Sequence, residues 1–337
     1  MSNSLREARL AALVELGREL MRQNYVWTCP SQGTQTLVNS RFTNRRAFTL
    51  ADLFGWNREG TLETLARQLP SGLIELLQDT SVLLISDGEC VRSRVRFSSY
   101  ADTLFAHPAW PDPQRDDLAM GPDSHRFGAF IARELPTCIP SSGVLGRPFT
   151  MVNVGCGNGA AGIVAARLLG GLAGELPKRV LLVDRNASAL RYAEVNARLA
   201  DLAHFECRQS DVLSAVHEPP TLVLANPPGL IDGQGVPSRH GGGELGTGLA
   251  LKIVDECLDR LLPGGALLMC AVAPVVRGVD VLRRSIEPRA QGIRRNRRVS
   301  LDYQVLETDV FSSELARPGC ADVERLSMVG VTLRLAS

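Results

Sequence analysis

Asn226 is followed by two prolines at the end of an apolar run, in the stretch TLVLANPPGL. Proline has a fixed φ and no N–H group, so Pro227 and Pro228 end the strand and restrain the backbone beside the asparagine. Asn226 can then present its side-chain oxygen, and the backbone a carbonyl, to a bound molecule. Fixed acceptors of this kind orient an N–H group and favour the pyramidal form of an attacking nitrogen. The pattern predicts that a reacting group lies at this turn.

A glycine-rich turn, VNVGCGNGAAG, lies between a strand-like run and a helix-like run. Gly155, Gly157 and Gly159 let the backbone turn tightly and approach a ligand without a Cβ clash. Their G-x-G-x-G spacing differs from the dinucleotide fingerprint G-x-G-x-x-G, because the last glycine comes one residue early. The turn therefore predicts a cofactor site, but fits a dinucleotide less well.

Two acids follow the next two strand-like runs. Asp184 ends the run VLLVD, 25 residues after Gly159, where a carboxylate can accept both hydroxyls of a ribose. Asp211 and Val212 follow the third run, where a carboxylate and an apolar side chain can bracket an adenine ring. The alternative for Asp184 is a helix N-cap. Together with the glycine turn, these residues predict a nucleoside pocket at the carboxyl edge of a parallel sheet.

These features resemble the class I S-adenosylmethionine-dependent methyltransferases. The Asn-Pro-Pro element is similar to that of a subset that includes release-factor glutamine methyltransferases and small-domain RNA amino methyltransferases. The resemblance covers roughly residues 118–337 and implies S-adenosylmethionine as the cofactor. It implies cofactor contacts by Gly155, Gly157, Gly159, Asp184, Asp211, Val212, Asn226 and, before the first strand, Asp123. It implies a reaction at Asn226, Pro227 and Pro228.

The sequence departs from this subset directly after the prolines. The resembling enzymes have Tyr or Phe there, and this chain has Gly229. A planar acceptor would lose a stacking interaction worth about 1–3 kcal/mol per base. Alternatively, a ring from elsewhere fills the space, and the candidates are Tyr25, Trp27, Trp110 and Phe127. With net charge near zero, the missing ring favours a small polar acceptor, methylated on nitrogen or oxygen.

The elements that must position these residues alternate between strand and helix patterns from Phe149 onward. This alternation predicts an α/β fold with a Rossmann-like, doubly wound, mostly parallel sheet, closed by an antiparallel hairpin at the end of the chain. Residues 1–78 favour helices, and a hairpin around Asp87-Gly88 follows, as in a winged helix. We expect an N-terminal substrate or lid domain over 1–117 and a catalytic domain over 118–337.

Composition limits the remaining classes of function. The 37 Lys and Arg balance 36 Asp and Glu, so overall charge gives no argument for a nucleic-acid partner, which is not favoured, or for an anionic membrane. The eight cysteines are scattered singly and the five histidines are separated, so we expect no metal site and reduced thiols. No run is long enough to span a bilayer, and the N-terminus lacks a signal-peptide pattern. We expect a cytoplasmic protein, and the sequence makes no prediction of its oligomeric state.

Three alternatives stay open at this point. Seven arginines in residues 283–300 could bind a phosphate backbone, which would favour an RNA or a protein glutamine as the acceptor, although a solvated helix face or a loop explains them equally well. A second alternative is an enzyme that consumes S-adenosylmethionine without methylating, by cyclising its aminobutyl chain. A nicotinamide oxidoreductase would share the fold but leave Asn-Pro-Pro unexplained.

Overall fold

The computed structural model describes residues 3–86, 89–109, 120–138, 149–173, 179–231, 240–291, 293–294 and 297–336. The chain forms two compact units. The first comprises Met1–His125 with Gly157–Ile163 and Arg191–Leu202, and the second comprises Arg126–Cys156, Val164–Leu190 and Ala203–Ser337. The chain therefore passes between the units several times, and each unit is described by itself.

The first unit is mostly helical and contains two small antiparallel sheets, ordered β1-β3-β2 and β4-β5. The elements from α3 to β3 follow the order of a winged helix, which is a helix (α3), a strand (β1), two helices (α4 and α5) and a hairpin (β2 and β3). The expected turn at Asp87-Gly88 lies outside the described residues. The elements are α1 (Asn3–Arg22), α2 (Gln32–Asn39), η1 (Phe42–Asn44), α3 (Leu50–Phe54), β1 (Gly60–Thr61), α4 (Leu62–Ala66), α5 (Ser71–Asp79), β2 (Leu83–Ser86), β3 (Cys90–Ser93), β4 (Val95–Tyr100) and β5 (Thr103–Pro108).

The core of the first unit joins segments that are far apart in the sequence. Leu16 and Leu20 of α1, Phe54 of α3 and Phe97 of β4 are fully buried in it. Tyr192, Val195 and Leu199, from the later segment 191–202, belong to the same cluster. A Cβ at Gly17 would lie 2.7 Å from the methyl groups of Leu199, so α1 packs closely on this segment. The helical segment 191–202 is therefore part of the packing of the N-terminal elements.

The second unit is built on one large sheet with the order β12-β13-β14-β10-β9-β6-β7-β8 and with β11 paired to β10. β10, β9, β6, β7 and β8 are parallel neighbours, whereas β14 is antiparallel to both β10 and β13. The strands are β6 (Thr150–Val154), β7 (Arg179–Asp184), β8 (Phe205–Gln209), β9 (Leu222–Ala225), β10 (Ala266–Val276), β11 (Val279–Asp280), β12 (Ile293–Arg294), β13 (Arg297–Glu307) and β14 (Arg325–Leu335).

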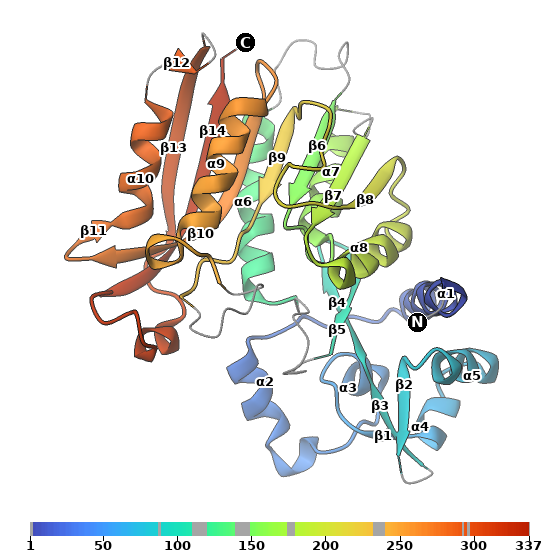
Figure 1. Ribbon diagram of the computed structural model, residues 1–337. Coiled ribbons are helices and arrows are strands. Elements are labelled where there is room, and N and C mark those ends of the chain that lie inside the picture. Colours follow the sequence, from blue (N-terminus) through green and yellow to red (C-terminus); the bar gives the residue numbers. More distant parts are fainter. Residues whose placement is uncertain are drawn as a thin grey trace. The chain divides into compact units, whose positions relative to one another are not determined.

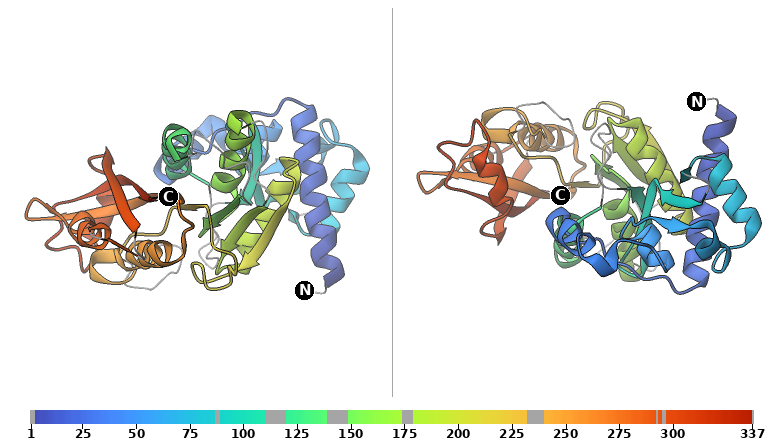
Figure 2. Two further views of the ribbon diagram at one scale, coloured as in Figure 1. Left: turned by 90° about the horizontal axis from the view of Figure 1, so that it is seen from above. Right: turned by 90° about the horizontal axis from the view of Figure 1, so that it is seen from below.

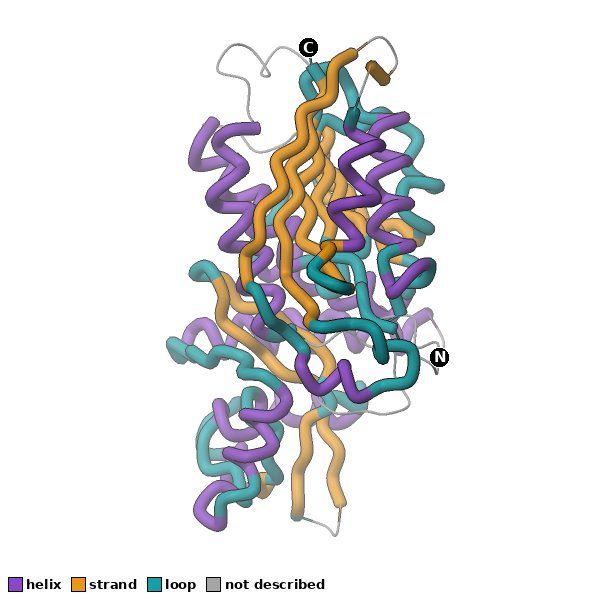
Figure 3. The backbone as a smooth tube through the Cα atoms, turned by 90° about the vertical axis from the view of Figure 1, so that its left-hand side faces the viewer, coloured by secondary structure: helices purple, strands orange, loops and turns teal. Residues whose placement is uncertain are grey.

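Helices cover both faces of this sheet (Figures 1, 2 and 3). α9 and α10 lie on one face of it and α6 lies on the other. Phe130 of α6 packs so closely on Gly330 of β14 that a Cβ at Gly330 has no room. The remaining elements are α6 (Pro122–Cys138), α7 (Ala160–Ala173), α8 (Ala187–Leu199), η3 (Glu244–Gly246), α9 (Gly248–Arg260), α10 (Val281–Ala290) and η4 (Ser312–Ala316).

The apolar character of the central strands explains this arrangement. Every residue of β6 and β9 is buried, as expected for parallel strands that are covered on both faces. The predicted fold class, an α/β protein with a mostly parallel sheet and a closing antiparallel hairpin, is confirmed. One detail differs: β13 begins inside the arginine run, so the run is divided between α10 and the strands that follow.

Candidate active site

Four parallel strands of the second unit end side by side. Val154, the last residue of β6, pairs with Val183 of β7 and with Ala225 of β9. The last residues of β7 and β8, Asp184 and Gln209, pair with each other. The chain leaves this edge at Gly155, Asp184, Ser210-Asp211 and Asn226, so the residues singled out in the second unit follow neighbouring strands. Ligands of parallel α/β sheets bind at such carboxyl edges.

Asp184 is buried, with 5% of its surface exposed. Its Oδ1 accepts a hydrogen bond from the backbone N–H of Asn186 at 2.8 Å, which fixes the carboxylate at the start of the turn after β7. The backbone N–H of Cys156 donates to the carbonyl of Val183 at 3.0 Å. Burial raises the pKa of the Cys156 thiol well above its usual value, and the charges of Asp184 and Cys207 add to this effect. Cys156 is therefore a protonated packing residue and not a nucleophile.

Asp211 is more open than Asp184, with 59% of its side chain exposed. Its Oδ2 accepts from Lys252 Nζ of α9 at 2.5 Å. Val212 is buried and has φ +52°, a left-handed conformation that β-branched residues rarely adopt. Strain of this type costs about 1–3 kcal/mol and concentrates at ligand sites. Sequence reasoning missed Lys252, because the helix that carries it begins beyond the glycine-rich loop.

Asn226 is half-buried, and its side-chain amide makes no hydrogen bond to another residue in the described part of the chain. Pro227 is buried and Pro228 is half-buried. A Cβ at Gly229 would lie 2.9 Å from Val272 Cβ and 3.4 Å from Val272 N, both on β10. The glycine is therefore required by close approach of the motif to β10, and an aromatic residue does not fit on this backbone.

The glycine-rich loop that follows packs its backbone directly against the same motif. Gly241 N donates to Leu230 O at 3.1 Å, and a Cβ at Gly241 would lie 2.8 Å from Pro228 O. A Cβ at Gly246 would lie 2.6 Å from Gly229 O. These glycines hold the loop close to the motif. Among the polar residues of this loop, His240 and Glu244 are exposed and Arg239 lies outside the described residues.

The other glycines of the turn belong to the first unit. Gly157 and Gly159 have φ +55° and +82°, and Gly155 has φ +59°, so all three adopt conformations that favour glycine. Asn158 between them is 9% exposed, and its Oδ1 accepts from Ala160 N at 3.3 Å. Its Nδ2 is buried with no partner in the described part of the chain. Such a donor fits an anionic group of a bound cofactor, such as a carboxylate. Sequence reasoning missed Asn158.

Asp123 lies in the first turn of α6, in the first unit, and is half-exposed. Of the rings considered as substitutes for the missing aromatic, Trp27 and Phe127 are 6% and 2% exposed. Neither presents an open ring face to an acceptor. The Tyr25 hydroxyl donates to Phe97 O at 2.9 Å, and Trp110 lies outside the described residues. We therefore have no structural support for a substitute ring.

The arginine run is largely neutralised where its side chains are described. Arg283 pairs with Glu287 at 2.7 Å, Arg289 with Asp255 at 3.1 Å, and Arg284 with Glu244 at 3.7 Å. Two of the five histidines lie in the first unit. His107 is fully buried against Ser98, and the ring of His125 lies edge-on to Tyr100.

No group of three or more His, Cys, Asp or Glu side chains in the described ranges could hold a metal ion. Among the described helices, none has the length and apolar character needed to cross a membrane.

Comparison with known proteins finds a family match in the central segment. Residues 144–287 match the model of the family described as "Methyltransferase small domain". A curated relative, the ribosomal protein L11 methyltransferase of Alkaliphilus metalliredigens, is 25% identical over 134 residues, or 36% of this chain and 38% of the relative. The chain thus matches well under half the length of that relative.

Solved structures also resemble the chain. The tRNA m1G37 methyltransferase of M. jannaschii has 14% identity and a TM-score of 0.45, with 72% of this chain and 57% of that chain covered. The ribosomal protein L11 methylase of Lactobacillus delbrueckii subsp. bulgaricus has 14% identity and a TM-score of 0.39, with 63% and 80% covered. The family match confirms the resemblance to Rossmann-like methyltransferases, an enzyme class that uses S-adenosylmethionine.

Proposed function

We propose that this protein transfers a methyl group from S-adenosylmethionine to a nitrogen or oxygen atom of a polar acceptor held beside Asn226. The observation that carries the proposal is the succession of Asp184, Asp211 and Asn226 after three of the four neighbouring parallel strands, with the glycine turn after the fourth. The family match over residues 144–287 supports it. When bound, S-adenosylmethionine supplies the electrophilic methyl group.

The chain's own residues have separate parts in this proposal. Asp184 accepts hydrogen bonds from the ribose, and Asp211 with Val212 borders the adenine. Asn158 offers its Nδ2, which has no partner among the described residues, to the carboxylate of the methionine part. Gly155 and Gly157 leave room for the cofactor, and Asp123 is a further proposed contact. A Cβ at Gly159 would lie 3.2 Å from Ala193, so this glycine lets the turn pack closely on the segment 191–202.

Methyl transfer from a sulfonium is an in-line displacement, so alignment of the acceptor is the main requirement. The Asn226 amide, which forms no hydrogen bond within the described part of the chain, is placed for this task. Its oxygen accepts a hydrogen bond from the acceptor and orients the acceptor's lone pair, while Pro227 and Pro228 restrain the backbone. Of the two arguments for a small acceptor, one was the missing aromatic. Gly229 has a packing reason at Val272, so its presence no longer bears on the size of the acceptor.

Thermal unfolding with S-adenosylhomocysteine and with NAD tests the cofactor. A ligand at 100 times its Kd stabilises the folded state by about 2.7 kcal/mol. We expect this stabilisation with S-adenosylhomocysteine only. Asp184→Asn should remove it, whereas Asp322→Asn, at an exposed position, should retain it. Stabilisation by NAD alone would replace this proposal with an oxidoreductase.

Incubation of the protein with S-adenosylmethionine, with and without candidate acceptors, tests the reaction. S-adenosylhomocysteine should form only when an acceptor is present, and Asn226→Ala should lower kcat more than it weakens cofactor binding. Release of methylthioadenosine without any acceptor would contradict methyl transfer and indicate cyclisation of the aminobutyl chain.

A further inference from the structure

Charge is unevenly distributed along the N-terminal part of the chain. Residues 20–51 contain four arginines and neither Asp nor Glu, although the whole chain has 37 basic and 36 acidic residues. Arg22 pairs with Glu19 of α1. The other three, Arg41, Arg45 and Arg46, form no ion pair with any residue in the described ranges. This stretch is thus a local cationic region in a chain that is close to neutral.

The same stretch exposes large apolar side chains. Phe42 is 82% exposed and Phe48 is 68% exposed, and with Val26 (75%) and Leu37 (65%) they are the four most exposed large hydrophobic residues in the described ranges. The Arg45 guanidinium lies over the Phe42 ring, 5.3 Å from its centre. We call Arg41, Phe42, Arg45, Arg46 and Phe48 the Arg–Phe surface.

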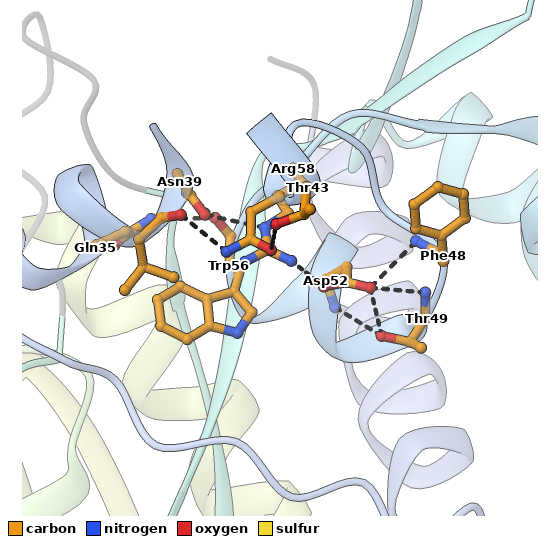
Figure 4. A network of polar contacts seen from close by, with 10 residues as sticks. Gln35, Asn39, Thr43, Phe48, Thr49, Asp52, Trp56 and Arg58 are labelled. Carbon is orange, nitrogen blue, oxygen red and sulfur yellow. Dashed lines mark hydrogen bonds and ion pairs between the residues drawn. The ribbon is translucent and has the colours of Figure 1, made fainter. Parts of the chain in front are cut away.

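A network of hydrogen bonds around Asp52 and Arg58 holds the backbone of this stretch in place (Figure 4). Asp52 forms an ion pair with Arg58, and its Oδ2 accepts from the backbone N–H groups of Phe48 and Thr49 at 3.2 and 3.1 Å. Arg58 Nε also donates to Asn39 Oδ1 at 3.0 Å. The backbone that carries Phe48 is therefore fixed, although its ring is exposed.

Two further hydrogen bonds hold the elements on either side of Phe42, which are α2 and the end of η1. Asn39 Nδ2 donates to Trp56 O at 2.9 Å, and Asn44 Nδ2 donates to Val38 O at 3.0 Å. The first bond joins α2 to a residue after α3, and the second joins η1 to α2. The backbone that carries the two rings is therefore preorganised. A partner that binds them does not have to offset the entropic cost of ordering this segment.

We propose that the Arg–Phe surface binds single-stranded RNA. Three arginines that form no ion pair within the described ranges are complementary to phosphates, and two exposed rings are complementary to unstacked bases. This combination binds single strands. Ser40 and Thr43, both exposed, add hydroxyl groups that can bond to the ribose 2′-OH. This interaction goes beyond the proposed methyl transfer, because binding requires neither the cofactor nor the reaction.

Two other polyanions fit the surface less well. An anionic membrane binds amphipathic helices, but both rings lie outside the helices, on the short turn η1 and on the segment before α3. In a winged helix, the second of the two helices after the first strand binds duplex DNA, and here that helix is α5. Its sequence SGLIELLQD carries Glu75 and Asp79 and no basic residue, so it would repel a duplex.

Fluorescence anisotropy with a labelled 12-nucleotide single-stranded RNA, in the absence of cofactor, tests the proposal. Three phosphate contacts predict a slope of about −2 for log K against log salt. The affinity should therefore fall by roughly 20-fold between 50 and 200 mM salt. The variant R41A/R45A/R46A should lose this salt dependence. F42A/F48A should weaken binding by at least 5-fold and up to about 150-fold for each base that stacks.

Matched controls come from the same unit. Arg67→Ala and Arg92→Ala remove exposed arginines that pair with Glu63 and Glu59, and Leu84→Ala removes an exposed apolar side chain. These controls should bind RNA as the unaltered protein does. Since the altered side chains are exposed, all variants should unfold at nearly the same temperature.

Several results would overturn the proposal. These are equal loss of binding in the controls, unchanged binding by F42A/F48A, equal affinity for single-stranded DNA of the same sequence, or preferential binding to a duplex. Binding to vesicles containing phosphatidylserine, without binding to RNA, would assign the surface to a membrane instead. Failure of the methyl-transfer assay would leave the RNA-binding result unaffected, because that measurement contains no cofactor.

Discussion

Substitution of Gly229 tests the physical reason for the glycine after Asn-Pro-Pro. In Gly229→Ala the new Cβ would lie 2.9 Å from Val272 Cβ, a contact that real Cβ atoms essentially never make. Because Val272 Cβ is attached directly to the backbone of β10, relief requires the strand or the motif to move. Overpacking of this kind typically costs about 1–3 kcal/mol. Gly229→Tyr, which restores the aromatic of the resembling enzymes, should cost at least as much.

Calorimetry or thermal fluorescence measures the stability, and the methyl-transfer assay measures the activity. A destabilisation of about 1–3 kcal/mol corresponds to a fall in Tm of roughly 2–12 °C for a unit of this size. Displacement of Asn226 should lower kcat as well. The matched control is Gly171→Ala in α7, where a Cβ meets nothing within 4 Å. That change should stabilise the helix by about 0.5–1 kcal/mol.

The partner is tested by a double-mutant cycle. Val272→Gly removes the clashing atom, so Gly229→Ala should cost less in that background, with an interaction energy of about 0.5–3 kcal/mol. If Gly229→Ala leaves Tm and kcat unchanged, or if its cost is the same in both backgrounds, the packing explanation is wrong. The glycine at position 229 would then again be an argument for a small acceptor.

Three further changes have defined outcomes. Burial and the charge of Arg96 lower the pKa of His107 to about 3, below its unfolded value near 6.5, so the folded state favours the neutral ring. The stability that the neutral His107 ring contributes is therefore fully present above pH 6.5, and the free energy of unfolding falls by about 2 kcal/mol by pH 5. Acid-unfolding curves of His107→Gln should lose this dependence. Lys252→Met frees the Asp211 carboxylate, and calorimetric titration at low salt should show S-adenosylhomocysteine binding up to about 5-fold tighter, the worth of an exposed ion pair. Asn158→Asp places a negative charge where we propose a carboxylate binds, so the same titration should show at least roughly a 10-fold loss of affinity, and unchanged affinity would contradict that contact.

The fold could be predicted because its signals are local. The apolar runs of β6, β7 and β9 and the glycines between strand and helix are read within a few residues. The order of Asp184, Asp211 and Asn226 along one edge then follows from parallel topology alone. By contrast, Gly229 is explained by Val272, which lies on another strand and is 43 positions away. No local pattern contains that contact.

The same distinction applies to the side chains that reasoning from sequence missed. Lys252 reaches Asp211 across 41 positions, and Asn158 becomes notable only because its Nδ2 is buried without a partner in the described residues. The ion pairs of the arginine run could not be predicted from the sequence for a similar reason. Glu244 and Asp255, which help to neutralise it, lie before it in the sequence, and Glu287 faces Arg283 only because α10 is a helix. Charge composition does not reveal such pairing.

Asn196 has a consequence for how this protein can be divided. This fully buried side chain bonds to both the N–H and the carbonyl of Ala106 in β5, at 2.7 and 2.9 Å, and to the carbonyl of Asn158 in the glycine turn, at 2.8 Å. Tyr192, Val195 and Leu199 are packed in the N-terminal core from the same segment. The glycine turn is thus built partly from the N-terminal elements. Removal or replacement of the N-terminal residues would therefore take away the Ala106 contacts of Asn196, the residue that bonds to the glycine turn. The N-terminal residues cannot be exchanged between related enzymes as an independent domain.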